Sequence, residues 1–174
     1  VFNEYSSIKK TTGTQAIKIK DGDELLSVSL MGEENVLMVT KNGMTIKIPT
    51  DDIRAIGRLT SGVKGIGLKD GDEVVAAFPI KAHWAGFITE SGKGKKVLID
   101  QFIIQERGGR GMSGIKLDPN DYVAAAIPIT LPTPNATESL LIVGKPNSIC
   151  IPTDELTEQR SLDRKSGSAG MPRP

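Results

Sequence analysis

Two segments of the sequence combine basic residues with closely spaced glycines, a combination suited to contacts with phosphate groups. Arg58 lies in the first segment, residues 53–65, and Arg107 holds the matching position in the second, residues 102–114. A guanidinium group can donate paired hydrogen bonds to a phosphate, and glycine lets backbone N–H groups approach the same anion. A charged cluster is more commonly only a solvated surface. Because the arginine position repeats, we expect these segments to hold a bent polyanion by its backbone, with an affinity that falls with salt.

The distribution of charge says more about a partner than the total charge does. The chain carries 22 Lys and Arg against 21 Asp and Glu, and its net charge of +1 argues neither for nor against nucleic acid. Basic residues outnumber acidic ones in residues 41–69 and 81–116. The acidic residues gather at 21–24, 33–34, 70–73 and 118–121. We therefore expect the two signs of charge to be separated in space in the folded protein.

Two motifs that could indicate ligand sites are better explained as turns. Gly109, Gly111 and Gly114 match the spacing of a dinucleotide-binding loop, but that motif requires a following helix, and no helical period follows here. The acidic turns at 21–24 and 70–73 lack the downstream glutamate that a calcium loop requires. We expect the glycines to shape a crossover and the acidic residues to form hairpin turns, with no metal site and no cofactor.

The reactive side chains of the sequence show no catalytic arrangement. His83 is the single histidine, lies beside Trp84 and has no recognisable nucleophile or acid partner, so we expect a packing role for the pair. Tyr122 occupies a position that belongs to a strand, and Tyr5 lies in the least patterned part of the sequence. Cys150, the single cysteine, excludes an internal disulfide and fits a reducing compartment. No apolar run is long enough to span a membrane, and no signal-peptide pattern is present.

An internal repeat must position these segments. Residues 48–80 align without a gap on residues 97–129 when shifted by 49 positions. Residues 11–26 repeat the second half of this unit, and residues 151–156 repeat the start of its first half. The repeat predicts one domain, residues 1–174. It divides the domain into a half repeat (1–32), two whole repeats (33–80 and 81–130) and a partial repeat (131–174).

Each whole repeat is expected to contain four strands in two hairpins, joined by the glycine-rich crossover. Alternating apolar residues and turn signals, of which Asn42-Gly43 is the strongest, mark the strands. The predicted strands are 16–20, 25–30, 36–40, 44–48, 65–68, 74–80, 85–89, 94–98, 122–129, 140–143 and 148–151. No segment has a sustained helical period, so the fold class is all-β. Four strands per repeat predict a propeller-like array of about three to four blades.

Three stretches of the sequence resemble a known family. Residues 36–43, 53–66 and 70–75 are closely similar to the C-terminal repeats of the A-type subunits of bacterial DNA gyrase and of the related topoisomerase IV. The resemblance covers nearly the whole chain and weakens after about residue 130. It implies a β-pinwheel, a propeller-like array in which neighbouring repeats exchange hairpins. It also implies a domain that binds duplex DNA around its outer rim and bends it.

The second crossover resembles the gyrase box, a heptapeptide of the form Q-x-R-G-G-K-G. Arg110 stands where that motif has lysine. The positions carried over from the motif are Gln105, Arg107, Gly108, Gly109, Arg110 and Gly111.

The resemblance implies a non-catalytic DNA-binding and DNA-bending or wrapping module of a type II topoisomerase A-type subunit, without the catalytic tyrosine or the ATPase region. Its partners would be double-stranded DNA, the rest of the A-type subunit, and the B-type ATPase subunit, in the cytoplasm at the nucleoid. The residues expected to contact phosphates are Lys41, Lys47, Arg54, Arg58, Lys64, Lys93, Lys95, Lys96, Arg107, Arg110, Lys116, Arg160, Arg164 and Lys165. The alternative is a propeller for protein–protein interaction, in which the acidic hairpin tips or Trp84 contact the partner.

Overall fold

The computed structural model describes residue 11 and residues 13–32, 34–57, 60–130 and 138–158. In these parts every extended element is a β-strand, and the helical elements are short 3-10 turns, which confirms the all-β class. The strands are β1 (Val36–Thr40), β2 (Met44–Ile48), β3 (Val74–Pro79), β4 (Trp84–Thr89), β5 (Gly94–Leu98), β6 (Met112–Ser113), β7 (Val123–Ile129), β8 (Ser139–Val143), β9 (Ser148–Pro152) and β10 (Thr157–Glu158). The 3-10 turns are η2 (Thr50–Asp52), η3 (Ile99–Gln101) and η4 (Thr153–Glu155).

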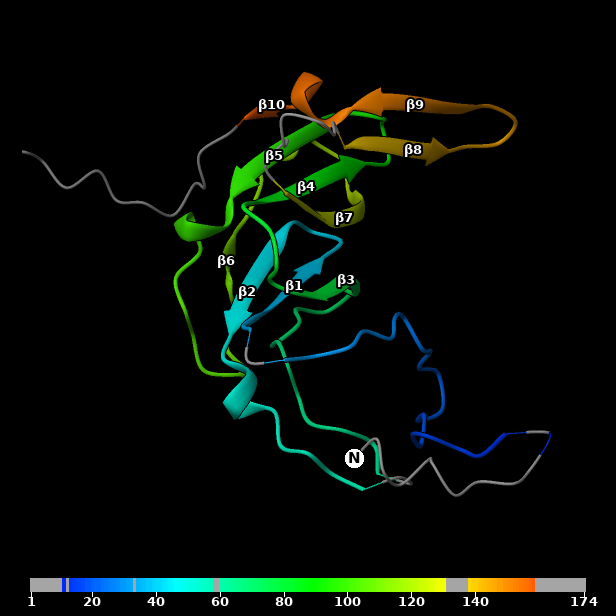
Figure 1. Ribbon diagram of the computed structural model, residues 1–174, viewed down its shortest axis with the longest axis vertical. Helices are drawn as coiled ribbons and strands as arrows, with labels where there is room; N and C mark the ends of the chain where they lie inside the picture. Colours follow the sequence, from blue (N-terminus) through cyan, green and yellow to red (C-terminus); the bar gives the residue numbers. More distant parts are fainter. Residues whose placement is uncertain (1–10, 12, 33, 58–59, 131–137, 159–174) are drawn as a thin grey trace, which may run out of the picture.

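The strands form two four-stranded sheets and one hairpin, stacked along the long axis of the molecule (Figure 1). Sheet A has the order β3-β1-β2-β6, and sheet B has the order β10-β5-β4-β7. β8 and β9 form an antiparallel hairpin above sheet B (Figure 1). Strands β4, β5 and β7 take the places of β1, β2 and β3. Even the irregularity of the ladder recurs, between Val39 and Thr40 in one sheet and between Ile88 and Thr89 in the other.

The two arms of the second predicted hairpin lie in different sheets, and this corrects the expectation of two hairpins per repeat. β6 pairs with β2 of the preceding repeat, whereas β7 pairs with β4 of its own repeat. The chain between them crosses from one sheet to the other and buries Ile115 in the core. Gly114 lies so close to the Thr45 side chain that no β-carbon fits there. This exchange of a strand between repeats is the β-pinwheel arrangement.

The strands predicted at 16–20, 25–30 and 65–68 are not formed, because no strand among the described residues completes a ladder with them. The arm at 65–68 instead pairs with the next crossover. Gly67 N–H donates to the Gly109 carbonyl at 2.7 Å, and Gly108 N–H donates to the Gly65 carbonyl at 2.6 Å. The remaining strand predictions are confirmed to within one residue at each end.

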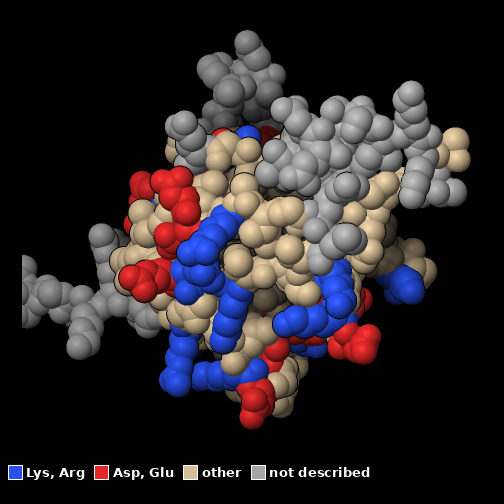
Figure 2. Space-filling view, turned by 90° about the horizontal axis from the view of Figure 1, so that it is seen from below, with Lys and Arg blue, Asp and Glu red and all other residues tan. Residues whose placement is uncertain are grey.

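Both faces of sheet A are buried. Leu37 and Val39 pack toward sheet B, where Phe87 belongs to the same cluster. On the opposite face Ile46 and Ile48 belong to a second cluster. An apolar core on both faces leaves only strand edges, crossovers and hairpin tips for charged groups. Figure 2 shows Lys and Arg side chains lying side by side on one face of the molecule, with Asp and Glu groups around them.

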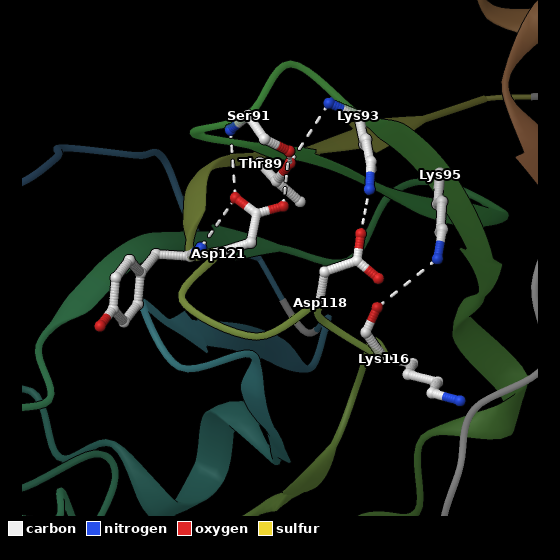
Figure 3. Close-up of polar contacts among 8 residues, drawn as sticks. Thr89, Ser91, Lys93, Lys95, Lys116, Asp118 and Asp121 are labelled. Carbon is white, nitrogen blue, oxygen red and sulfur yellow. Dashed lines mark hydrogen bonds and ion pairs between the residues drawn. The ribbon is translucent and has the colours of Figure 1, made fainter.

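In each whole repeat, one aspartate just before β3 or β7 holds the tip of the neighbouring hairpin, β1–β2 or β4–β5. Asp121 accepts hydrogen bonds from the Ser91 hydroxyl at 2.7 Å, the Ser91 N–H at 3.1 Å and the Tyr122 N–H at 3.0 Å (Figure 3). Asp72 accepts from the Asn42 N–H in the same way at 3.0 Å. The Ser91 hydroxyl, followed by the other donors, lowers the pKa of Asp121 from 3.8 to about 2. The predicted acidic turns therefore have a structural role here.

The glycines at matching positions of the crossovers adopt a backbone conformation that other residues rarely adopt. Gly62 has φ +79° and Gly111 has φ +72°. Gly111 also faces the Thr45 carbonyl oxygen, which would lie only 2.6 Å from an added β-carbon. These two constraints, the backbone angle and the contact with β2, hold the crossover against sheet A.

Replacement of Asp121 by Asn is expected to reduce the loss of stability in acid. Because the pKa is lower in the folded state, the carboxylate stabilises the fold above its unfolded pKa, and this contribution disappears as pH falls from about 4 to about 2. Thermal unfolding followed by circular dichroism between about pH 5 and about pH 2 measures the slope of stability against pH. Asp100→Asn, at an exposed position of η3, is the control. An unchanged slope in Asp121→Asn would contradict the role of this carboxylate.

Replacement of Gly111 by Ala is expected to lower the free energy of unfolding by about 1–3 kcal/mol, because it adds both strain and a clash. Gly92→Ala is the matched control, since Gly92 has φ +84° but no atom within 4 Å of an added β-carbon. It should cost about 1 kcal/mol from strain alone. Urea denaturation measures the free energy of unfolding of both variants. Equal losses of stability would show that the contact of Gly111 with sheet A contributes nothing to the cost of the substitution.

Candidate nucleic-acid interface

The second crossover, residues 102–111, runs along the outer edge of sheet A. Phe102 anchors its start in the core between the sheets. Ile104 then forms a parallel bridge with Lys47, and Gln105 N–H donates to the Lys47 carbonyl at 2.8 Å. At its far end, β6 pairs with β2. The backbone of the crossover is thus fixed to β2 at both ends, while Arg107 and Arg110 are exposed.

Basic residues from three segments lie along this edge. The hydrogen bonds between Gly65–Gly67 and Gly108–Gly109 place the first crossover beside the second. The aliphatic part of the Lys64 side chain consequently lies 3.9 Å from the place that a β-carbon on Gly108 would occupy. Lys47 lies on the adjoining strand. We refer to Lys47, Lys64, Arg107 and Arg110 as the crossover cluster.

The separation of charges expected from the sequence is incomplete beside this cluster. A hollow of about 430 Å³ lies between η2 and the second crossover. Arg54 and Arg107 line it, but so do the acidic residues Asp51, Asp52 and Glu106. A phosphate group in this hollow would meet charges of both signs. The exposed side of the crossover is therefore the better site for an anion.

A second basic group surrounds β5 at the corresponding edge of sheet B. Lys95 Nζ donates to the Lys116 carbonyl at 3.5 Å, which brings these two residues near each other (Figure 3). Lys96 Nζ lies 5.3 Å from the centre of the Trp84 ring and donates to the Thr153 carbonyl at 3.1 Å. This contact gives Trp84 the packing role predicted for it. The exposed His83 ring is 5.9 Å away from the Trp84 ring.

Two lysines that were predicted to contact phosphate are held by carboxylates. Lys41 Nζ lies 3.2 Å from Glu73 and 3.8 Å from Glu90, and the hydrogen bond with Glu73 raises its pKa. Lys93 forms an ion pair with Asp118, which raises the pKa of Lys93 and lowers that of Asp118 (Figure 3). These contacts favour a structural role for both lysines at the hairpin tips.

Four of the predicted residues, Arg58, Arg160, Arg164 and Lys165, lie outside the described residues. The start of the third crossover, however, is described. In β10, Thr157 and Glu158 pair in parallel with Lys95 and Lys96, just as Ile104 pairs with Lys47 in sheet A. The parallel pairing that holds the second crossover against sheet A therefore recurs one repeat later, in sheet B. Sequence reasoning missed this parallel pairing, although residues 151–156 repeat residues 48–53 and could have indicated it.

Within the described residues, no cluster of His, Cys, Asp or Glu could hold a metal ion. None of the helical turns in the same part of the chain has the length and apolar character needed to cross a bilayer.

Comparison with known proteins identifies the family. The sequence model described as "DNA gyrase C-terminal domain, beta-propeller" matches residues 2–30, 34–81 and 87–130. The A subunit of DNA gyrase from Deinococcus deserti is 34% identical over 61 residues, which make up 34% of this chain and 7% of that protein. The A subunit of DNA gyrase from Escherichia coli is 36% identical over 58 residues, or 33% of this chain and 6% of that protein. The chain thus matches only a small part of these curated relatives.

Solved structures show the same architecture. The C-terminal domain of DNA topoisomerase IV superposes with a TM-score of 0.77 at 21% identity, covering 91% of this chain and 50% of that one. The DNA gyrase A C-terminal domain superposes with a TM-score of 0.72 at 25% identity, covering 85% of this chain and 50% of that one. Together with the match over most of the sequence, these structures show that the chain belongs to the family of DNA gyrase C-terminal domains with the β-propeller fold.

Proposed function

We propose that the chain is a non-catalytic module that binds and bends double-stranded DNA, within the A-type subunit of a type II topoisomerase, either gyrase or topoisomerase IV. The observation that carries the proposal is the crossover cluster at the outer edge of sheet A, where backbone hydrogen bonds hold the crossovers and Lys64, Arg107 and Arg110 are exposed to solvent. Proteins matched by this chain are named as the A subunit of DNA gyrase, which supports a role on DNA.

Contact with the DNA backbone explains the residue types in the cluster. Arg107 and Arg110 can each donate paired hydrogen bonds to a phosphate, and the glycines between them leave the backbone accessible. Lys47 and Lys64 add positive charge without a fixed geometry. Contacts of this kind give affinity that depends on salt and little on base sequence.

Bending follows from repetition of the edge contact. Each of the two sheets carries the next crossover along its outer edge, through the same parallel pairing. DNA that contacts the outer edges of both sheets must follow the line along which these edges lie. Smooth bending of a site of about 20–30 base pairs costs about 1–6 kcal/mol, so more than one cluster has to contribute.

The proposed partners are double-stranded DNA, the remainder of the A-type subunit, and the B-type ATPase subunit. The proposed location is the cytoplasm, at the nucleoid. The chemical steps of strand passage would reside in those other parts, and this chain would control the path of the DNA segment.

Reversal of charge in the cluster, Arg107→Glu with Arg110→Glu, is expected to weaken DNA binding by about tenfold or more. Loss of two phosphate contacts should also make the slope of log affinity against log salt shallower by about 2. A mobility-shift titration at several salt concentrations measures both quantities. Lys69→Glu with Lys145→Glu, two exposed lysines outside the candidate set, controls for the change in net charge. Equal affinity of the two double variants would remove the cluster from the interface.

Bending is expected to accelerate the circularisation of a duplex of about 150 base pairs, the persistence length, by DNA ligase. The Arg107→Glu/Arg110→Glu variant should lose this acceleration even at concentrations that saturate the DNA. Salt-sensitive binding without faster circularisation would exclude bending. No binding at low salt would exclude the DNA role altogether and favour a protein-interaction propeller.

A further inference from the structure

The second crossover carries an exposed isoleucine at the outer edge of sheet A. Phe102 is buried, whereas Ile104, two residues further along the chain, is 56% exposed. The parallel bridge to Lys47 fixes the backbone of Ile104, and the hydrogen bond from Gln105 N–H to the Lys47 carbonyl at 2.8 Å continues the pairing. The ladder therefore sets the position of this apolar side chain.

The ladder does not require an apolar residue at this place. In sheet B the corresponding residue is Glu158 of β10, which pairs in parallel with Lys96 as Ile104 pairs with Lys47. In the first crossover the residue that aligns with Ile104 is Ala55. Glutamate, alanine and isoleucine thus occupy equivalent positions, and strand pairing does not explain the isoleucine. A ligand that removes its side chain from water would explain it.

Cross-strand pairs show the direction of the Ile104 side chain. Residues that lie directly opposite each other in a ladder have their side chains on the same face of the sheet. Ile104 pairs with Lys47, and Lys47 pairs with Leu37, which belongs to the core cluster between the two sheets. Phe102, on the same side of the extended segment as Ile104, belongs to that cluster too. Ile104 and Lys47 therefore lie on the face of sheet A that is turned toward sheet B.

Sheet B presents basic residues to the same part of the rim. In β5, Lys95 pairs with Phe87, a member of the same core cluster, so Lys95 lies on the face that is turned toward sheet A. Its Nζ donates to the Lys116 carbonyl at 3.5 Å (Figure 3). Figure 1 shows β2 and β5 on the same side of the stack. Ile104 thus lies at the rim between Lys47 of sheet A and the two lysines associated with sheet B.

The size and the charge of this site favour DNA over a protein as the partner. A protein interface of standard size takes about 20–30 residues from each side, far more than one exposed isoleucine provides. A DNA duplex, in contrast, can accept a single apolar side chain as a wedge between two base pairs of its minor groove. Phosphates line that groove on both sides and suit a wedge with basic residues on both sides. Glu106, the nearest acidic residue in the sequence, lines the hollow beside η2.

We propose that Ile104 inserts into the minor groove of bound DNA and partly separates two stacked base pairs, a role that rests on the proposed function. The resulting kink lies where the duplex passes from the edge of sheet A to the edge of sheet B. Steps in which a purine follows a pyrimidine, such as TA, are the most easily kinked. The chain is therefore expected to prefer DNA that places such a step at Ile104.

Oxidation by permanganate tests the wedge, because this reagent attacks thymines that have lost their stacking neighbours. At concentrations that saturate the duplex in a mobility shift, the unmodified chain should raise the reactivity of thymines at TA steps severalfold. Ile104→Ser should abolish this increase, and Ile104→Leu should retain it, because leucine also serves as a wedge. Ile103→Ser is the matched control and should retain it, since Ile103 is 64% exposed on the opposite face of the same segment.

The possible outcomes separate the wedge from the proposed function. Glu158 shows that a polar side chain is compatible with the pairing, so Ile104→Ser should fold, as checked by circular dichroism. Bound DNA without increased thymine reactivity would overturn the wedge while leaving the proposed DNA binding intact. Equal reactivity with Ile104→Ser, or an equal loss with Ile103→Ser, would overturn the role of Ile104. A lack of binding by the unmodified chain would overturn the proposed function as well.

Competition between two duplexes of equal base composition tests the preference for flexible steps. One duplex carries TA steps about ten base pairs apart, which is one helical turn, and the other carries AT steps at the same places. The unmodified chain should bind the first duplex several times more tightly, whereas Ile104→Ser should bind both equally. Equal binding of the two duplexes by the unmodified chain would overturn insertion at such steps.

Discussion

The parallel contact between each crossover and the outer strand of the preceding sheet is the interaction on which the rest of this structure depends. It joins Ile104 to Lys47 in sheet A and Glu158 to Lys96 in sheet B. A connection that merely looped through solvent would leave its basic residues mobile and its sheet short of an outer strand. Because the crossover is part of the ladder, the elements that complete the sheet also hold Arg107 and Arg110 at the rim.

The same contact explains why glycine and arginine occur together. A crossover pressed against β2 must avoid the Thr45 carbonyl and side chain, and only glycine at 111 and 114 leaves room. Both faces of the sheet are filled by clusters around Leu37 and Ile46, and Met112, between these two glycines, belongs to the first of them. Arg107 and Arg110, which precede Gly111, are exposed instead. Long charged side chains are therefore directed to solvent. Packing and the display of charge are two results of one local geometry.

The sequence predicted what depends on local pattern and failed where a distant partner decides. The repeat, the strands β1 to β5 and the Asn42-Gly43 turn follow from alternation and turn chemistry, which are visible within a few residues. Residues 16–20 and 25–30 have the same alternation but form no ladder with any strand in the described part of the chain. At the candidate site, the exposure of Arg107 and Arg110 could be expected. The pairing of Lys41 with Glu73 could not, because ladder register across 32 residues brings those charges together.

Exchange of strands between repeats links the sheets to the row of crossover edges. Each sheet takes its outer strand from the following repeat, so each sheet that is completed also gains one crossover edge. If bending costs about 1–6 kcal/mol, an edge with few basic clusters binds straight DNA as well as bent DNA. A longer continuous rim shifts that balance toward the bent form, so completion of the sheets and control of the DNA path would be linked by the same strand exchange.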